Sequence, residues 1–292
     1  MLEHSAMNSK VILTIDIEDW AQSTWDRSLE ISDRALHNTQ NILDILAKRG
    51  TTVTMFVLGK FAQKFPNIVK QIAEAGHEIA SHGFGHIEVF HQTPEEFKAD
   101  IQRSKDILED LTGQQVLGYR APDFSILSDN IWALEVLAEV GYIYDSSIFP
   151  IKHKQYGISW WPTGPVSVNL PSGSSIIELP LASLTFLGKR WPVAGGGYHR
   201  LLPRFMIYVA IKRYLKQNKP FVAYCHPYEF DSTELANLDI KISLRTRLHQ
   251  GLGRRGFQKK FEYLLKSFEV TSALDVVRNC QLENYIVPMN YS

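Results

Sequence analysis

Short apolar runs alternate along the chain with longer segments in which apolar residues recur every three to four positions. The short runs predict buried strands, and the longer segments predict amphipathic helices. Strands are expected at residues 10–16, 51–58, 78–81, 116–119, 142–144, 174–179, 221–225 and 268–271. Helices are expected at residues 32–49, 93–111, 129–140, 203–216 and 257–266, with one more ending near Gly76 and a short one beginning at Ala273.

The regular alternation of strand and helix indicates the fold class. Successive strand–helix units imply a parallel sheet, because each helix carries the chain back to the start of the next strand. The length of 292 residues favours a barrel over an open sheet. We therefore expect an α/β fold, a distorted (β/α) barrel of about seven or eight units. No linker divides the chain, so residues 8–292 are expected to form one domain, with residues 235–292 as a C-terminal extension packed on it.

Composition narrows the class of function. The chain is 45% hydrophobic and carries 31 basic and 31 acidic residues, which is typical of a globular protein and argues against a nucleic-acid partner. Two cysteines, Cys225 and Cys280, are too few for a disulfide framework and favour a reducing, cytoplasmic setting. The polar residues 1–10 predict neither a signal peptide nor a membrane span, and Met7 is an alternative start.

Ionisable side chains directly follow several of the predicted strands. They are Asp16, Glu18, Asp19, His82, His86, Arg120, Asp145 and His226. The carboxyl ends of parallel strands in a barrel share one rim, so these side chains are expected to surround one site.

His82 and His86 are candidate metal ligands. Residues four apart lie on one face of a helical turn, so both rings can face one ion, although either histidine could instead cap a turn or fill the core. A third ligand would be a carboxylate. Alternate residues of a strand share a face, which favours Glu18 beside Asp16, but Asp19 is equally able if the strand ends before Glu18. Two histidines and a carboxylate form a zinc ligand set that leaves a position open for hydrolysis.

Five short motifs occur in a characteristic order. They are Thr14-Ile15-Asp16, His82-x-x-x-His86, Arg120-x-Pro122, Asp145 within Tyr-Asp-Ser-Ser, and His226 after the late strand. With these motifs the chain resembles, over nearly its whole length, the polysaccharide deacetylases of the NodB-homology type, carbohydrate esterase family 4. Residues 195–198 and 226–231 resemble the branch associated with bacterial exopolysaccharide or O-antigen synthesis.

The resemblance implies a metal-dependent hydrolase that removes N-acetyl groups from an amino sugar in a bacterial polysaccharide or in its lipid- or nucleotide-linked precursor. Zinc is the expected ion. Asp16 matches the general base, His226 matches the general acid, and Arg120 matches the residue that orients the base. The histidine pair matches the metal ligands. Asp145 either positions Arg120 or His226, or caps the turn that follows it.

Three aromatic residues are candidate sugar contacts. Trp160 and Trp161 lie in the longest irregular stretch, where they either stack on a sugar ring or plug the mouth of the barrel. Tyr198 follows three glycines, which predict a tight turn.

A basic segment, residues 241–260, is either a solvated helix face or a site for the diphosphate of a linked sugar, with Arg254 and Arg255 as ligands.

Two other functions fit the same fold. One is a hydrolase of another amide, such as a cyclic imide or allantoin, that works without metal, and the other is a sugar-binding barrel that has lost catalysis. The presence of both Asp16 and His226 argues against the second, because binding alone requires neither.

Overall fold

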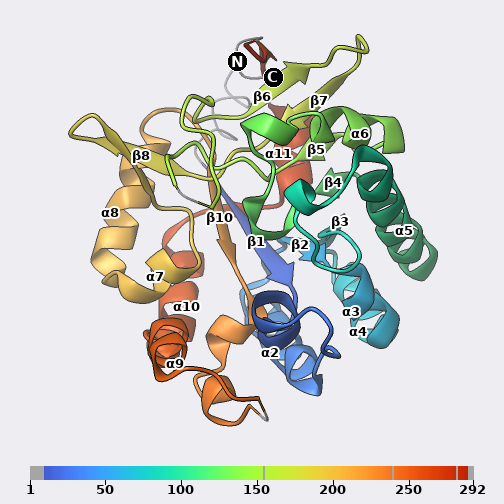
Figure 1. Ribbon diagram of the computed structural model, residues 1–292. Coiled ribbons are helices and arrows are strands. Elements are labelled where there is room, and N and C mark those ends of the chain that lie inside the picture. Colours follow the sequence, from blue (N-terminus) through green and yellow to red (C-terminus); the bar gives the residue numbers. More distant parts are fainter. Residues whose placement is uncertain (1–9, 154, 239, 281, 289–292) are drawn as a thin grey trace.

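A sheet of mostly parallel strands forms the centre of the computed structural model, which describes residues 10–153, 155–238, 240–280 and 282–288 (Figure 1). Along the sheet the strands follow the order β10-β1-β2-β3-β4-β5-β7-β6-β12, and β11 pairs with β1. Their bounds are β1 (Val11–Ile17), β2 (Thr54–Val57), β3 (Glu78–Ser81), β4 (Gly118–Tyr119), β5 (Tyr144–Asp145), β6 (Val166–Asn169), β7 (Ser175–Glu178), β10 (Phe221–Cys225), β11 (Val270–Thr271) and β12 (Glu283–Ile286). A separate antiparallel hairpin consists of β8 (Ser183–Phe186) and β9 (Lys189–Pro192).

The sheet curls back on itself between β7 and β10. After β7 the chain returns to β10, where the Ala182 N–H donates to the carbonyl of Val222 at 3.4 Å. On the same edge, the Tyr224 N–H donates to the carbonyl of Ala194 at 3.0 Å. A Cβ on Gly195 would lie only 1.9 Å from the carbonyl oxygen of Tyr224, so glycine is required for this close approach. The predicted distorted barrel is confirmed, with β6 and β12 extending the sheet beyond it.

Helices pack around the outside of the sheet (Figure 1). Their bounds are α2 (Asp33–Arg49), α3 (Gly59–Lys64), α4 (Pro66–Glu74), α5 (Pro94–Thr112), α6 (Ala133–Val140), α7 (Gly197–Leu201), α8 (Arg204–Leu215), α9 (Leu244–Gly251), α10 (Phe257–Ser267) and α11 (Ala273–Asn279). Thr93 begins α5 with a capping box: its hydroxyl accepts from the Glu96 N–H, and the Glu96 carboxylate accepts from the Thr93 N–H. No helix in the described part of the chain is both long and apolar enough to span a bilayer.

The predicted elements agree with the structure where the apolar pattern is strong. The structure shortens the strand expected at 51–58 and divides the helix expected before Gly76 at Phe65, because Pro66 begins a new helix there. The pattern misses β6, β8, β9 and β12, whose residues are largely polar or exposed, and the short helices α7 and α9. The expectation about the N-terminus falls mostly on residues 1–9, outside the described residues.

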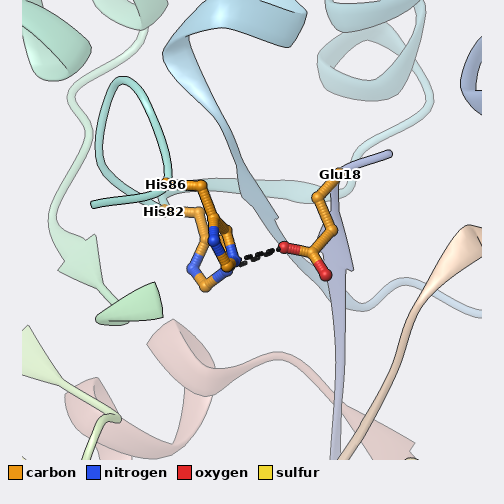
Figure 2. A group of neighbouring side chains, drawn as sticks. All are labelled: Glu18, His82 and His86. Carbon is orange, nitrogen blue, oxygen red and sulfur yellow. Dashed lines mark ion pairs between the residues drawn. The ribbon is translucent and has the colours of Figure 1, made fainter. Parts of the chain in front are cut away.

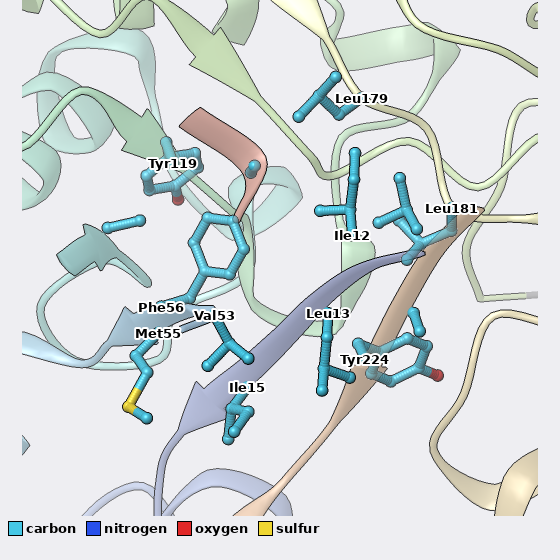
Figure 3. Packing of buried hydrophobic residues seen from close by; sticks show 14 of the residues in the cluster. Ile12, Leu13, Ile15, Val53, Met55, Phe56, Tyr119, Leu179, Leu181 and Tyr224 are labelled. Atoms are coloured by element: carbon cyan, nitrogen blue, oxygen red, sulfur yellow. The ribbon is translucent and has the colours of Figure 1, made fainter. Parts of the chain in front are cut away.

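Strand β1 is buried along its whole length and forms the centre of the core (Figure 3). Ile12, Leu13 and Ile15 pack there with side chains from distant parts of the chain, among them Phe56 and Leu181. A strand covered on both sides reads as a continuous apolar run, which explains why it could be recognised from sequence. This burial fixes the strand from whose end Asp16 and Glu18 project.

Candidate active site and metal centre

The ends of β1, β3 and β10 bring five of the eight predicted ionisable residues to one rim, whereas Asp19, Arg120 and Asp145 do not line the cavity there. The cavity has a volume of about 710 Å³, and its wall includes Asp16, Glu18, His82, His86 and His226. Residues more than 200 positions apart in the sequence thus share one cavity. The wall also includes residues that the sequence did not single out as site residues, namely Arg27, Glu88, Tyr156, Tyr224 and Tyr228.

Glu18, His82 and His86 form a compact buried group (Figure 2). Glu18 Oε2 lies 2.7 Å from His86 Nε2 and 3.5 Å from His82 Nε2. Burial acts to raise the pKa of Glu18, but His86 and His82 outweigh it and hold this pKa well below its usual range. Burial likewise acts to lower the pKa of His86, and the Glu18 carboxylate reverses the shift and raises it.

The loop that carries the two histidines is not helical, so the prediction of a shared helical turn was wrong. His82 directly follows β3, and the chain then passes through Gly83 and His86 in left-handed conformations, with φ of 75° and 59°. Asp100 from α5 holds the loop by accepting a hydrogen bond from the Phe84 N–H at 2.9 Å. The two rings face the same point because the loop folds back, with their centres 5.4 Å apart.

The donor atoms of this group fit a divalent metal ion. One ligand atom from each residue can be chosen so that all lie within 4.8 Å of one another. Tetrahedral zinc, with bonds of about 2.0–2.1 Å, holds its ligand atoms about 3.3 Å apart, so small adjustments would suffice. His82 Nδ1 donates to the carbonyl of Arg120 at 2.8 Å, which leaves Nε2 free to act as a ligand. Glu18 Oε2 is buried, and the polar atoms that it faces are the Nε2 atoms of His86 and His82, which are the other candidate ligand atoms.

Asp19, the alternative carboxylate ligand, points away from this group. Its two oxygens accept hydrogen bonds from the backbone of Ala21 at 2.8 Å and of Ser32 at 2.5 Å. Ala21 begins a π-helical turn, Ala21–Trp25, and Ser32 is the residue before α2. Strand β1 ends at Ile17, so alternation along the strand does not by itself decide between the two acids. Their contacts do, because Glu18 Oε2 lies 2.7 Å from His86 Nε2 whereas the Asp19 carboxylate is bound by backbone N–H groups. The structure thus brings Glu18, and not Asp19, to the histidine pair.

Arg120 is completely buried and holds Asp16 in place. Its Nη1 donates to Asp16 Oδ1 at 2.8 Å and to the hydroxyl of Thr14 at 2.6 Å. Its Nε donates to the carbonyl of Ser146 at 3.0 Å, and the guanidinium lies 4.2 Å from the ring centre of Phe56. A charge so enclosed is tolerated only with such partners, so Asp16 has one fixed orientation.

His226 lies near the second carboxylate oxygen of Glu18, Oε1, whereas the histidine pair faces Oε2. Its Nε2 is 3.9 Å from Asp16 Oδ2 and 3.7 Å from Glu18 Oε1, and its ring stacks on Tyr228. Its Nδ1 lies 3.5 Å from Glu229 Oε2. Burial acts to lower the pKa of His226, but Glu229 and the two cavity carboxylates outweigh it and raise the pKa to about 9. Glu229 was missed from the sequence, although its position three residues after His226 in a tight turn is a usable signal.

Asp145 does not contact His226. It accepts hydrogen bonds from the Ser147 N–H at 3.1 Å and hydroxyl at 2.5 Å, and it faces Glu178 across the strand pair β5–β7. Burial raises the pKa of Glu178, and the adjacent Asp145 adds to the shift. Asp145 therefore fixes the loop in which Ser146 holds Arg120, an indirect positioning of Arg120.

The candidate sugar contacts lie off the cavity wall. Trp161 is fully buried against Tyr285, with ring centres 5.0 Å apart, and Trp160 packs on Trp161. These positions favour the plug over sugar stacking. Tyr198 is half-buried and lies beside Tyr156, which does line the cavity.

Of the two arginines named for the alternative diphosphate site in the basic segment, Arg255 is exposed and Arg254 is not available. That side chain is buried, and its Nη1 pairs with Glu234 at 2.5 Å and donates to the carbonyl of Tyr228 at 2.8 Å. Its charge is therefore used within the protein, where it holds the turn that follows His226.

Two family models match the chain. Residues 9–144 match the family described as "Polysaccharide deacetylase". The chain carries a polysaccharide deacetylase domain. Residues 146–278 match a "Domain of unknown function (DUF3473)", so the border between the two matches falls directly after β5, inside the central sheet.

Comparisons with known proteins agree with this deacetylase domain. A peptidoglycan-N-acetylglucosamine deacetylase of Bacillus cereus is 38% identical over 101 residues, which are 34% of this chain and 37% of that protein. The chain thus spans well under half the length of that relative. Among solved structures, a protein of Mycobacterium smegmatis assigned to the polysaccharide deacetylases aligns over 95% of this chain and 93% of its own, with a TM-score of 0.63 at 18% identity. An allantoinase aligns over 92% and 89%, with a TM-score of 0.61 at 15% identity. At such identities these two structures establish the shared fold alone.

Proposed function

We propose that the protein is a metal-dependent N-deacetylase that acts on an amino sugar in a bacterial polysaccharide or in its lipid- or nucleotide-linked precursor. The observation that carries the proposal is the grouping of Glu18, His82 and His86 in one cavity with Asp16 and His226. The deacetylase domain and the name of the Bacillus cereus relative support an N-acetylated sugar as substrate. Exopolysaccharide synthesis and a cytoplasmic setting are parts of the same proposal.

Glu18, His82 and His86 would hold the ion. A divalent cation, which we propose to be zinc, supplies Lewis acidity when bound: it acidifies a water molecule and polarises the acetyl carbonyl group. This donor set, two imidazoles and one carboxylate, is one that leaves a coordination position open for substrate.

Asp16 and His226 divide the proton transfers between them. Asp16, oriented by Arg120, accepts the proton of the attacking water as its oxygen bonds to the acetyl carbon. His226, kept protonated beside Glu229, donates a proton to the sugar nitrogen, and the carbon–nitrogen bond then breaks to give acetate and a free amine. The side chains of Asp16 and His226 lie close enough, 3.9 Å, to act on one acetamido group.

The decisive experiment measures acetate released from N-acetylated saccharides by protein that has been stripped of metal and reloaded with zinc. We expect release from at least one of peptidoglycan fragments, chitooligosaccharides or exopolysaccharide, and none after Asp16→Asn or His82→Ala/His86→Ala. Retention of sugar binding by Asp16→Asn without turnover would assign the loss to the base. Turnover that persists in the histidine double variant would instead support an amide hydrolase that works without metal.

A further inference from the structure

Basic residues are segregated from acidic ones in one part of the chain. Residues 179–228 contain eight lysines and arginines and no aspartate or glutamate, although the chain as a whole has a formal charge of zero. The rest of the chain therefore carries a formal charge of −8. This segment includes the hairpin β8–β9 and helix α8, which pack against each other on one side of the molecule (Figure 1).

The hairpin and α8 also expose large apolar side chains. We call the set formed by Phe186, Leu187, Trp191, Phe205, Met206 and Val209 the hairpin–α8 surface, and each of these residues is exposed. Helix α8 turns Ile207, Ile211 and Tyr214 to the core, so its exposed apolar residues lie on the opposite face. Exposed basic residues accompany them, namely Lys189 on the hairpin and Lys212, Arg213 and Lys216 in the second half of α8 and just after it.

Leu187 at the tip of the hairpin is not explained by folding. The hairpin register pairs Phe186 with Lys189, which leaves Leu187 and Gly188 as the two turn residues. Both are left-handed, with φ of 50° and 71°, a turn in which asparagine or aspartate is the usual first residue. Leucine is disfavoured in this conformation, and 85% of Leu187 is exposed, so it gains little from packing. Because folding does not favour leucine at this position, we infer that the side chain serves to contact another molecule.

The hairpin is held firmly at its base. Arg190 Nη1 donates to the carbonyls of Trp161 at 2.6 Å and of Pro150 at 3.3 Å. The tip, with Leu187 and the neighbouring Phe186, therefore projects from a fixed support.

We propose that the hairpin–α8 surface docks on a membrane that contains anionic lipids. Apolar and aromatic side chains, Trp191 among them, would enter the boundary between headgroups and acyl chains, as in interfacial proteins. The lysines and arginine around them would contact anionic headgroups. Protein–protein interfaces are usually depleted in lysine, which favours a lipid surface over a protein partner. The docking does not depend on the proposed activity, because none of its residues belongs to the metal group or lines the catalytic cavity.

Vesicle flotation tests the proposal with the full chain. We expect at least about tenfold stronger binding to phosphatidylcholine vesicles with about one third phosphatidylglycerol than to phosphatidylcholine alone, and weaker binding as salt is raised. Binding should shift the tryptophan emission to shorter wavelength, and Trp191→Phe should reduce that shift. Equal binding to both kinds of vesicle, or to neither, would overturn the proposal.

Leu187→Asn separates folding from docking. This exchange creates the favoured Asn-Gly turn, so its thermal midpoint should equal or exceed that of the parent protein, while vesicle binding falls at least about fivefold. The matched control is Ile286→Asn on β12, where 73% of the side chain is exposed, and its binding should not change. A Leu187→Asn protein that binds like the parent would refute the role of the hairpin tip.

Charge reversal tests the basic part of the surface. Arg213→Glu/Lys216→Glu should abolish binding to anionic vesicles, whereas Lys48→Glu/Lys70→Glu, the same change of net charge on exposed residues of α2 and α4, should retain it. Equal loss in both would indicate net charge alone and overturn the assignment of the surface. If the parent protein dimerises without vesicles and Leu187→Asn abolishes this dimer, the surface would instead bind a second copy of the chain.

Discussion

Oε2 of Glu229 lies 3.5 Å from Nδ1 of His226, which is the position from which a carboxylate can orient a catalytic imidazole. Arg200 is on the other side of Glu229, with its Nε 3.6 Å from Oε1, which keeps the carboxylate in place. The same carboxylate accepts a hydrogen bond from the backbone N–H of His226 at 3.2 Å. Glu229 therefore positions His226, the role that the sequence had offered to Asp145.

Glu229→Gln is expected to lower kcat by about ten- to a hundredfold and to leave KM within about twofold, because the change affects proton donation rather than sugar binding. The measurement is steady-state acetate release at saturating zinc. Glu283→Gln, on the exposed face of β12, serves as the control. A Glu229→Gln enzyme with unchanged kcat would show that His226 needs no carboxylate partner.

Glu18 and Asp19 are adjacent acids with different expected roles. Glu18→Gln should weaken zinc binding by more than about a hundredfold. Losing a residue that only hydrogen-bonds to a ligand typically costs about ten- to a hundredfold, so a larger loss marks Glu18 as a ligand itself. Asp19→Ala should leave zinc affinity unchanged and lower the free energy of unfolding by about 1–3 kcal/mol, because two partly buried backbone donors lose their acceptor. Competition with a chromophoric chelator measures the first effect, and urea unfolding measures the second. The reverse pattern would assign the metal to Asp19.

The fold and the membership of the site could largely be predicted, because both follow from strand order. A buried parallel strand such as β1 is a continuous apolar run, and whatever follows it lies on the common rim. The conformation of the loop that carries His82 and His86 could not be predicted, because a left-handed non-glycine residue depends on tertiary contacts such as that of Asp100 with Phe84. The burial of Arg254 was missed for a similar reason: its partner Glu234 lies 20 residues away in the sequence.

His199 should make stability depend on pH. It is buried, and its Nε2 donates to the carbonyl of Val193 at 2.9 Å. Burial lowers the pKa of His199 to about 4, below the value of about 6.5 expected in the unfolded chain. Between these values the unfolded state binds the additional proton, so this contribution to stability is complete above pH 6.5 and is lost as the pH falls toward 4.

His199→Gln keeps a donor for Val193 but does not titrate. We expect the parent protein to lose up to about 3 kcal/mol more stability than this variant between pH 7.5 and pH 4.5. Urea unfolding at the two pH values gives the difference. An identical loss in both proteins would mean that His199 is protonated in the folded state as readily as in the unfolded chain.

We propose that the two matched regions fold as one unit, since the border after β5 crosses a continuous sheet. Strand β1 pairs with β2 from the first region and with β10 and β11 from the second, and Arg120 is held by Ser146 from beyond the border. Residues 10–145 expressed alone would expose one edge of β1 and leave buried groups without partners, so we expect no cooperative thermal transition and no tight zinc site. Calorimetry and zinc titration of this fragment beside the full chain test the expectation. A fragment that melts cooperatively and binds zinc as tightly as the full chain would divide the protein into two domains at residue 145.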